Sequence, residues 1–290
     1  MKTNLLGIVS LMALFLVFSC GQQAKKVEGQ TDAQAEVMEK KAPVYNTDDP
    51  QTMLAAIEHA HGGWGDLWKK GDVQYTYHYH NPTLNKTDLS TERYIFDNEA
   101  SYGHYTQHEI NVMPSTEGKV TQCFDGENTL VLVDGEKTDD PQANAVGSFL
   151  RSANYFWFVM PYKLNDKGTI AAYEGQEEYN GRVYDKLKVT YDSELTGKEQ
   201  NDTYILYVNP DTKLIDRFYF SLPFMGVNEP VLIANYSYED IDGQLVATKR
   251  TYFLPNETGE YAEAPSLVQT LSDVKFNNGF TVENMMAALE

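Results

Sequence analysis

Cysteine is scarce in this 290-residue sequence, which contains Cys20 and Cys123 and no other cysteine. A framework of disulfides is therefore excluded, and if Cys20 is modified, Cys123 has no partner within the chain. Cys123 lies in an apolar-alternating segment, residues 120–124. We interpret it as a small buried hydrophobic residue rather than a nucleophile.

Positive charge is also scarce, with 23 lysines and arginines against 42 aspartates and glutamates, or a formal net charge of −19. A chain this acidic is repelled by phosphate backbones, so we expect no nucleic-acid partner. The sequence has no GxSxG elbow, P-loop, dinucleotide fingerprint or HExxH motif. We predict no catalytic site and no cofactor, and a metal- or carboxylate-dependent hydrolase is a distant alternative.

The six histidines all lie between His59 and His108. His78 and His80 share one face of a predicted strand, and His104 and His108 share a face of another. Two such pairs could bind zinc or copper if the strands were neighbours. Without a second cysteine nearby or closely spaced carboxylates, the favoured interpretation is a polar sheet surface with no metal.

The N-terminal segment is predicted to direct and anchor the protein. Residues 1–19 have the features of a signal peptide, with Lys2 followed by the apolar run Leu11–Phe18. That run is too short for a durable transmembrane helix. Residues 17–20, VFSC, resemble a lipobox, so we predict lipid attachment at Cys20. The polar residues 20–48 are interpreted as a flexible tether, and residues 49–290 as one folded domain.

From residue 73 onwards the apolar pattern has the period of two that is typical of strands. Tyr75, Tyr77 and Tyr79 share one strand face. About a dozen such segments follow, separated by turns such as Asn180-Gly181 and Asp242-Gly243. Strands that follow one another without helices between them pair antiparallel. The predicted class is mainly β, with a large antiparallel sheet.

The segment 142–164, QANAVGSFLRSANYFWFVMPYKL, is the exception to this pattern. Its helical spacing puts six apolar residues on one face, with Trp157 directed at the sheet and Phe158 turned towards a cavity. Asp140 is the predicted N-cap, and Pro161 is predicted to end the helix. We expect this helix on the concave side of the sheet. The six residues of the predicted face are Val146, Phe149, Leu150, Ala153, Phe156 and Trp157.

Four stretches of the sequence resemble known families. AIEHAHGGW at 56–64, FDGENTLVLVDGEK at 124–137 and DTYILYVNPDTKLIDRFYF at 202–220 resemble the lipoprotein-carrier superfamily. FLRSANYFWFVMPYKL at 149–164 is similar to an uncharacterised group of lipoproteins from Bacteroidota. The resemblance implies a single curved, unclosed antiparallel sheet, a half-barrel, wrapped around one or two helices with an apolar cavity between.

The same resemblance implies a function in the cell envelope. It implies binding of a lipid or acyl chain in the concavity of the half-barrel. Classical soluble carriers have no lipid anchor, whereas the lipobox-like residues predict one here, so we expect a lipid-anchored protein of the outer membrane. The alternative is a structural or protein-partner-binding lipoprotein with a filled core. The oligomeric state and the side of the membrane are left open. The candidate ligand-binding residues are Phe149, Phe156, Trp157, Phe158, Met160, Phe224, Met225, Tyr75, Tyr77 and Tyr79.

Overall fold

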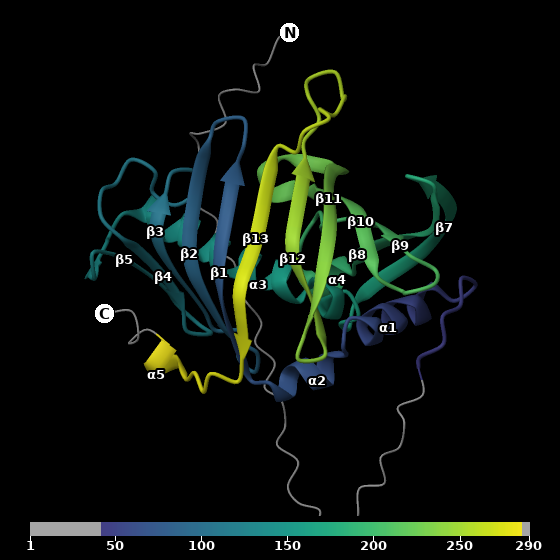
Figure 1. Ribbon diagram of the computed structural model, residues 1–290, viewed down its shortest axis with the longest axis horizontal. Helices are drawn as coiled ribbons and strands as arrows, with labels where there is room; N and C mark the ends of the chain where they lie inside the picture. Colours follow the sequence, from purple (N-terminus) through teal and green to yellow (C-terminus); the bar gives the residue numbers. More distant parts are fainter. Residues whose placement is uncertain (1–41, 286–290) are drawn as a thin grey trace, which may run out of the picture. The chain divides into compact units, whose positions relative to one another are not determined.

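One antiparallel sheet dominates the computed structural model, which describes residues 42–285 (Figure 1). Its spatial strand order is β6-β5-β4-β3-β2-β1-β13-β12-β11-β10-β9-β8-β7. The predicted class, a single unclosed antiparallel sheet with few helices, is confirmed. The strands are β1 (Asp72–Asn81), β2 (Lys86–Ile95), β3 (Ser101–His108), β4 (Val120–Phe124), β5 (Thr129–Val133), β6 (Glu136–Lys137), β7 (Thr169–Tyr179), β8 (Arg182–Tyr191), β9 (Tyr204–Val208), β10 (Ile215–Leu222), β11 (Val227–Ile241), β12 (Gln244–Phe253) and β13 (Leu267–Phe276).

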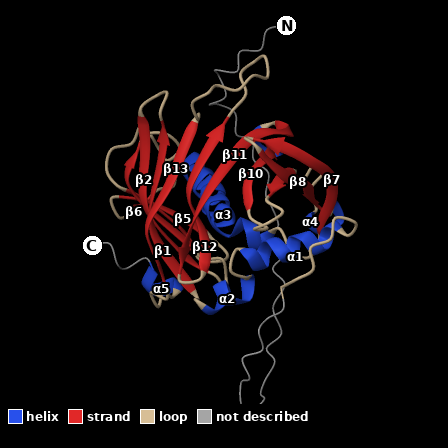
Figure 2. Ribbon diagram, turned by 45° about the vertical axis from the view of Figure 1, so that its right-hand side comes forward, coloured by secondary structure: helices blue, strands red, loops and turns tan. Residues whose placement is uncertain are grey.

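The longest helix connects the two edges of the sheet. The chain runs outward from β1 to β6, crosses over through α3 (Pro141–Lys163), and returns from β7 to β13, which pairs with β1. A helix of 23 residues is about 34 Å long. Figure 2 shows it lying across the inner face of the sheet. The shorter helices are α1 (Pro50–Ala60), α2 (Trp64–Lys69), α4 (Ser193–Thr196), η2 (Pro223–Met225) and α5 (Val282–Met285).

The start of α3 is as predicted, whereas its end is not. The Asp140 side chain accepts a hydrogen bond from the backbone N–H of Gln142 at 2.9 Å, so it is the N-cap. The prediction that Pro161 ends the helix is wrong, because α3 continues to Lys163. A proline this close to the end removes a single helical hydrogen bond. Tyr162 compensates, since it is buried and its hydroxyl donates to the His61 carbonyl at 2.7 Å.

The folded unit begins earlier than predicted. Tyr45, in the range interpreted as tether, donates a hydrogen bond from its hydroxyl to Asp185 of β8 at 2.8 Å. The ammonium of Lys213 lies 4.1 Å from the centre of the same ring. The compact unit starts at Pro43. The predicted signal peptide, Cys20 and most of the predicted tether lie outside the described residues.

Aromatic side chains fill the space between α3 and the sheet. Phe158 is 7% exposed, and its ring stacks on Tyr75 at 5.4 Å between centroids. The prediction that Phe158 faces a cavity is therefore wrong. Trp157 does point at the sheet, where its ring contacts Phe218 and Phe220 of β10, but it is only half-buried.

This difference in burial predicts which helix residue is more important for stability. Phe158→Ala should lower the free energy of unfolding by about 3–5 kcal/mol, because it removes a buried ring and leaves a cavity. Trp157→Ala should cost less, because water already reaches part of its ring. Urea unfolding of both variants measures the difference. A larger loss for Trp157→Ala would contradict this assignment of the core.

A second stability determinant is His61, just after α1. The residue is fully buried, and its Nδ1 lies 2.7 Å from the Ile57 carbonyl. Within residues 42–285 its Nε2 has no hydrogen-bond partner. Burial lowers the pKa of His61 to about 4, although the bond to Ile57 acts in the opposite direction. The folded state therefore favours the neutral imidazole.

The lowered pKa gives stability a defined dependence on pH. The unfolded chain binds a proton near pH 6.5, whereas the folded chain binds it only near pH 4, so acidification between these values favours unfolding. The loss attributable to His61 approaches about 3 kcal/mol. His61→Asn should remove this component while keeping an N–H donor near Ile57. Urea unfolding at pH 7, 6 and 5 tests it, and parallel pH profiles for wild type and variant would refute it.

Candidate functional site

The face of α3 that packs on the sheet is not the one its hydrophobic period predicts. The six apolar residues of the predicted face, here called the apolar stripe (Val146, Phe149, Leu150, Ala153, Phe156 and Trp157), are all only partly buried. The buried face instead carries Ala143, Gly147, Arg151, Tyr155 and Phe158. An arginine thus occupies the centre of the buried face, and an apolar surface is left partly uncovered beside it.

Small residues make this arrangement possible. A Cβ added to Gly147 would lie 2.7 Å from Cγ2 of Val131 in β5, so the helix can approach this strand only because position 147 has no side chain. A Cβ on Gly103 of β3 would lie 2.5 Å from Nη1 of Arg151. Gly103 therefore provides the space that the guanidinium occupies. The two glycines fix how closely the first half of α3 approaches the sheet and how it is rotated about its axis.

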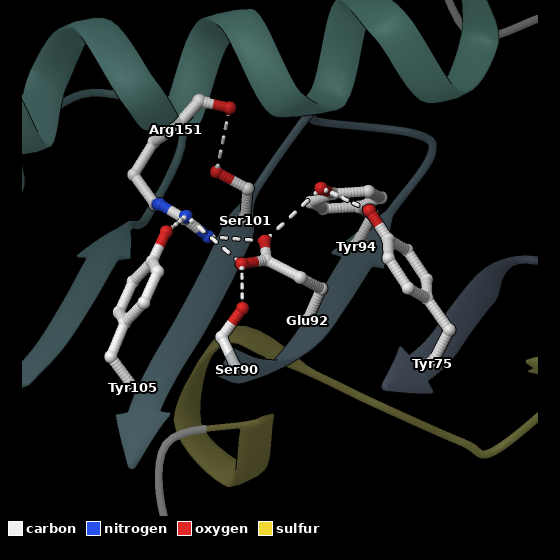
Figure 3. A network of polar contacts seen from close by, with 7 residues as sticks. All are labelled: Tyr75, Ser90, Glu92, Tyr94, Ser101, Tyr105 and Arg151. Atoms are coloured by element: carbon white, nitrogen blue, oxygen red, sulfur yellow. Dashed lines mark hydrogen bonds and ion pairs between the residues drawn. The ribbon is translucent and has the colours of Figure 1, made fainter. Parts of the chain in front are cut away.

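Arg151 is the centre of a buried polar network that joins α3 to β2 and β3 (Figure 3). Its Nη1 and Nη2 donate to the two carboxylate oxygens of Glu92, at 2.7 and 3.2 Å, and both side chains are fully buried. Nη2 also donates to the Tyr105 hydroxyl at 2.6 Å. Ser90 and Tyr94 donate to the same carboxylate, at 2.8 and 3.1 Å. Burial by itself would lower the pKa of Arg151, and Glu92 together with Tyr105 and Tyr94 more than reverses that effect.

Removing one member of the network should lower the free energy of unfolding strongly, whereas replacing both charged members by apolar residues should lower it much less. Glu92→Gln leaves a buried guanidinium without its counter-charge and should reduce stability by about 3–5 kcal/mol. Glu92→Leu combined with Arg151→Met should recover much of that loss, because both charges disappear together. Denaturant unfolding of the single and double variants gives the coupling energy. Purely additive losses would show that the pair is not a coupled unit.

The ten predicted ligand-binding residues fall into two groups. Tyr75, Tyr77, Phe158 and Met160 are buried in the core, and the Tyr75 hydroxyl lies 2.7 Å from that of Tyr94, next to Glu92. They support the sheet and are not available to a ligand in this conformation. The other six are half-buried or exposed: Tyr79, Phe149, Phe156, Trp157, Phe224 and Met225.

Five of this second group gather along α3. Phe224 and Met225, in η2 between β10 and β11, are 66% and 51% exposed. The Phe224 ring stacks on Phe149 of α3, with 5.0 Å between centroids and 16° between planes. The β10–β11 connection therefore touches the apolar stripe, which continues along the helix to Phe156 and Trp157. Exposed apolar surface of this kind is typical of a binding surface.

A small cavity lies on the other side of Leu150. Its volume is about 20 Å³, and it is lined by residues that include Tyr77, Tyr79, Asp88, Leu150 and Asn154. That is room for about one water molecule. Asp88 accepts backbone N–H bonds from Ile110 and Asn111, and burial raises the pKa of its carboxyl despite them.

The histidines of the predicted strand pairs contact one another or nearby sheet and loop atoms. The rings of His78 and His80 stack at 5.7 Å, and His104 Nδ1 lies 2.9 Å from the Thr121 hydroxyl. Both ring nitrogens of His108 lie near backbone carbonyls. Across residues 42–285, no three His, Cys, Asp or Glu side chains are grouped to hold a metal ion. Cys123 is buried and unpaired, and burial raises the pKa of its thiol to about 11.

No helix in the described part of the chain has the length and apolar character needed to cross a membrane. Residues 112–227, which include α3 and the strands on either side of it, match the model of a family described as "Family of unknown function (DUF6503)". No curated protein matches the sequence.

A solved structure shows the same fold. A DUF1329 family protein from Desulfovibrio piger has a TM-score of 0.52 at 15% identity, covering 84% of this chain and 99% of that one. An outer membrane lipoprotein-sorting protein domain from Vibrio parahaemolyticus, described as putative, gives 0.45 at 10% identity, covering 82% and 97%. A LolA superfamily protein from Nitrosomonas europaea gives 0.41 at 14%, covering 76% and 96%. The predicted resemblance to an uncharacterised family is confirmed, and the DUF1329 family protein shares the fold.

Proposed function

We propose that this protein is a lipid-anchored cell-envelope protein that binds a lipid or acyl chain on the concave side of its half-barrel and catalyses no reaction. Cys20 carries the anchor, and the membrane is the outer membrane. Residues 20–42 provide the tether that separates the folded unit from the bilayer. The ligand lies along the apolar stripe of α3, beneath the connection that holds Phe224 and Met225.

The partly uncovered apolar stripe is the observation that supports this proposal most directly. Six apolar side chains on one helix face remain in contact with water, although the helix crosses the inner side of a large sheet. Covering apolar surface is worth about 25 cal/mol per Å². A flexible acyl chain could cover this stripe without the directional contacts that the buried face of α3 already makes. The resemblance to lipoprotein carriers points to the same class of ligand.

A filled scaffold that binds a protein partner is the second candidate. The observation in its favour is the packing beneath the helix, where Phe158 and Met160 occupy the space between α3 and the sheet. The cavity beside Leu150, at about 20 Å³, is far smaller than the roughly 300–1,000 Å³ of typical ligand pockets. The two candidates differ in whether the purified protein carries bound lipid.

Phe149→Glu should separate them, because it places a charge on the apolar stripe and removes the ring under Phe224. We expect lipid extracted with the purified wild-type protein to fall at least tenfold in this variant, with the melting temperature little changed. The measurement is mass spectrometry of co-purified lipids. Leu84→Glu is the matched control, since Leu84 is 61% exposed in the β1–β2 turn, and it should retain lipid. If no lipid co-purifies with the wild-type protein or with either variant, the scaffold is favoured.

A further inference from the structure

Arg250 of β12 is a second buried arginine on the inner face of the sheet. It is 1% exposed and lies directly opposite Tyr236 of β11. The centre of its guanidinium is 5.3 Å from the Tyr236 ring, and Tyr75, Tyr77 and Tyr252 are its other close electrostatic neighbours. Tyr75 stacks on Phe158 of α3, so this group of tyrosines faces the helix. Arg250 therefore lies inside the concavity, between the two halves of the core.

In the described part of the chain, the positive charge of Arg250 has no counter-charge. Among residues 42–285 no carboxylate forms an ion pair with it. Nε donates to the Ala247 carbonyl at 3.2 Å, while Nη2 has no hydrogen-bond partner. The hydroxyl of the neighbouring Tyr236 interacts with the Tyr252 side chain. An arginine stays protonated in a protein, and a buried charge left unpaired is strongly unfavourable.

Two other buried arginines show how this chain usually satisfies such a group. Arg151 forms a two-bond pair with Glu92. Arg217 of β10 donates to Asn235 at 2.8 Å and to Tyr179 at 3.1 Å. Arg217 alternates with the core residue Phe218, so it lies on the outer face of the sheet. Each of the three arginines keeps one buried nitrogen without a partner among the described residues, but Arg250 differs from Arg151 in having no carboxylate beside it and from Arg217 in lying on the inner face of the sheet.

We propose that Arg250 binds the carboxylate of the ligand, which is a long-chain carboxylic acid, an inference that rests on the proposed function. A guanidinium and a carboxylate match in shape and form two parallel hydrogen bonds. One uncompensated cation suits one negative charge, and the nearby Arg151 is already neutralised by Glu92. Tyr236 lies directly opposite Arg250, so its hydroxyl can serve as a second donor to the same head group.

The apolar stripe leads to this position. Trp157, the last residue of the stripe, has its ring 6.4 Å from that of Tyr252. The Tyr252 hydroxyl donates to Gln269, which lies opposite Arg250 in the neighbouring strand. A ligand whose chain covers the stripe can therefore bring its acid group to Arg250 once the Trp157 and Tyr252 side chains rotate. Side-chain rotation of this kind is common on binding.

The test compares an acid and an alcohol of equal chain length. Full-length protein is titrated calorimetrically with laurate and with dodecanol at pH 8, in the wild type, Arg250→Met and Arg217→Met. We expect the wild type to bind laurate at least tenfold tighter than dodecanol. Arg250→Met should lose that preference and keep its affinity for dodecanol, whereas Arg217→Met should resemble the wild type. Without ligand, Arg250→Met should melt no lower than the wild type, because it loses an unpaired buried charge.

Each outcome separates this inference from the proposed function. If the wild type binds laurate and dodecanol equally well, the role of Arg250 is overturned, but the proposed binding of an apolar chain stands. This comparison needs no variant. A preference for laurate that survives in Arg250→Met would place the acid group elsewhere. Tighter binding of dodecyl phosphate than of laurate would overturn the assignment to a carboxylate. Binding of none of the three would overturn the proposed function itself.

Discussion

The crossing of the sheet by α3 is the constraint on which the rest of the structure depends. The helix connects strands at opposite edges of the sheet, so it must span the whole inner face. Its rotation about its own axis is set by Gly147 against Val131 and by Arg151 against Glu92. These contacts put Arg151, and not the apolar stripe, at the centre of the buried face, so the stripe stays only partly buried even where Trp157 touches β10. The surface that we assign to ligand binding is therefore a consequence of how a charged residue is buried.

The fold could be predicted from the sequence to a large extent, since its main signals are local. Period-two segments, turn residues and the Asp140-Pro141 helix start define the strands and α3 without knowledge of distant contacts. The helix face could not be predicted in the same way. Hydrophobic periodicity assigns the apolar stripe to the core, but the partner that buries Arg151 lies 59 positions away in β2. Pairing across such a distance leaves no trace in a single sequence.

The candidate site was predicted in part, for similar reasons. Large apolar residues in a helix and a turn are conspicuous in a sequence, and two of those named, Phe149 and Phe224, contact each other. The tyrosines of β1 were prominent for the same reason, yet two of the three are structural. A local signal for Arg250 does exist in the sequence: the arginine stands two residues before Tyr252 in a strand, which puts it on the same strand face as a buried tyrosine.

The pairing of β1 with β13 determines how such a chain can reach its folded state. Every other neighbouring pair of strands is also adjacent in the sequence, so the halves β1–β6 and β7–β13 can each form from short-range hairpins. Joining Val73 to Phe276 closes a loop of about 200 residues, and such a contact carries the greatest entropic cost in the fold. The pairing of β1 with β13 should therefore form late in folding. It brings the first and the last strand of the sequence side by side in the middle of the sheet. A circular permutant could join the end of β13 directly to the start of β1 and place the new termini in a turn elsewhere. The slowest strand pairing would then be local in sequence, so this permutant should fold faster to the same sheet.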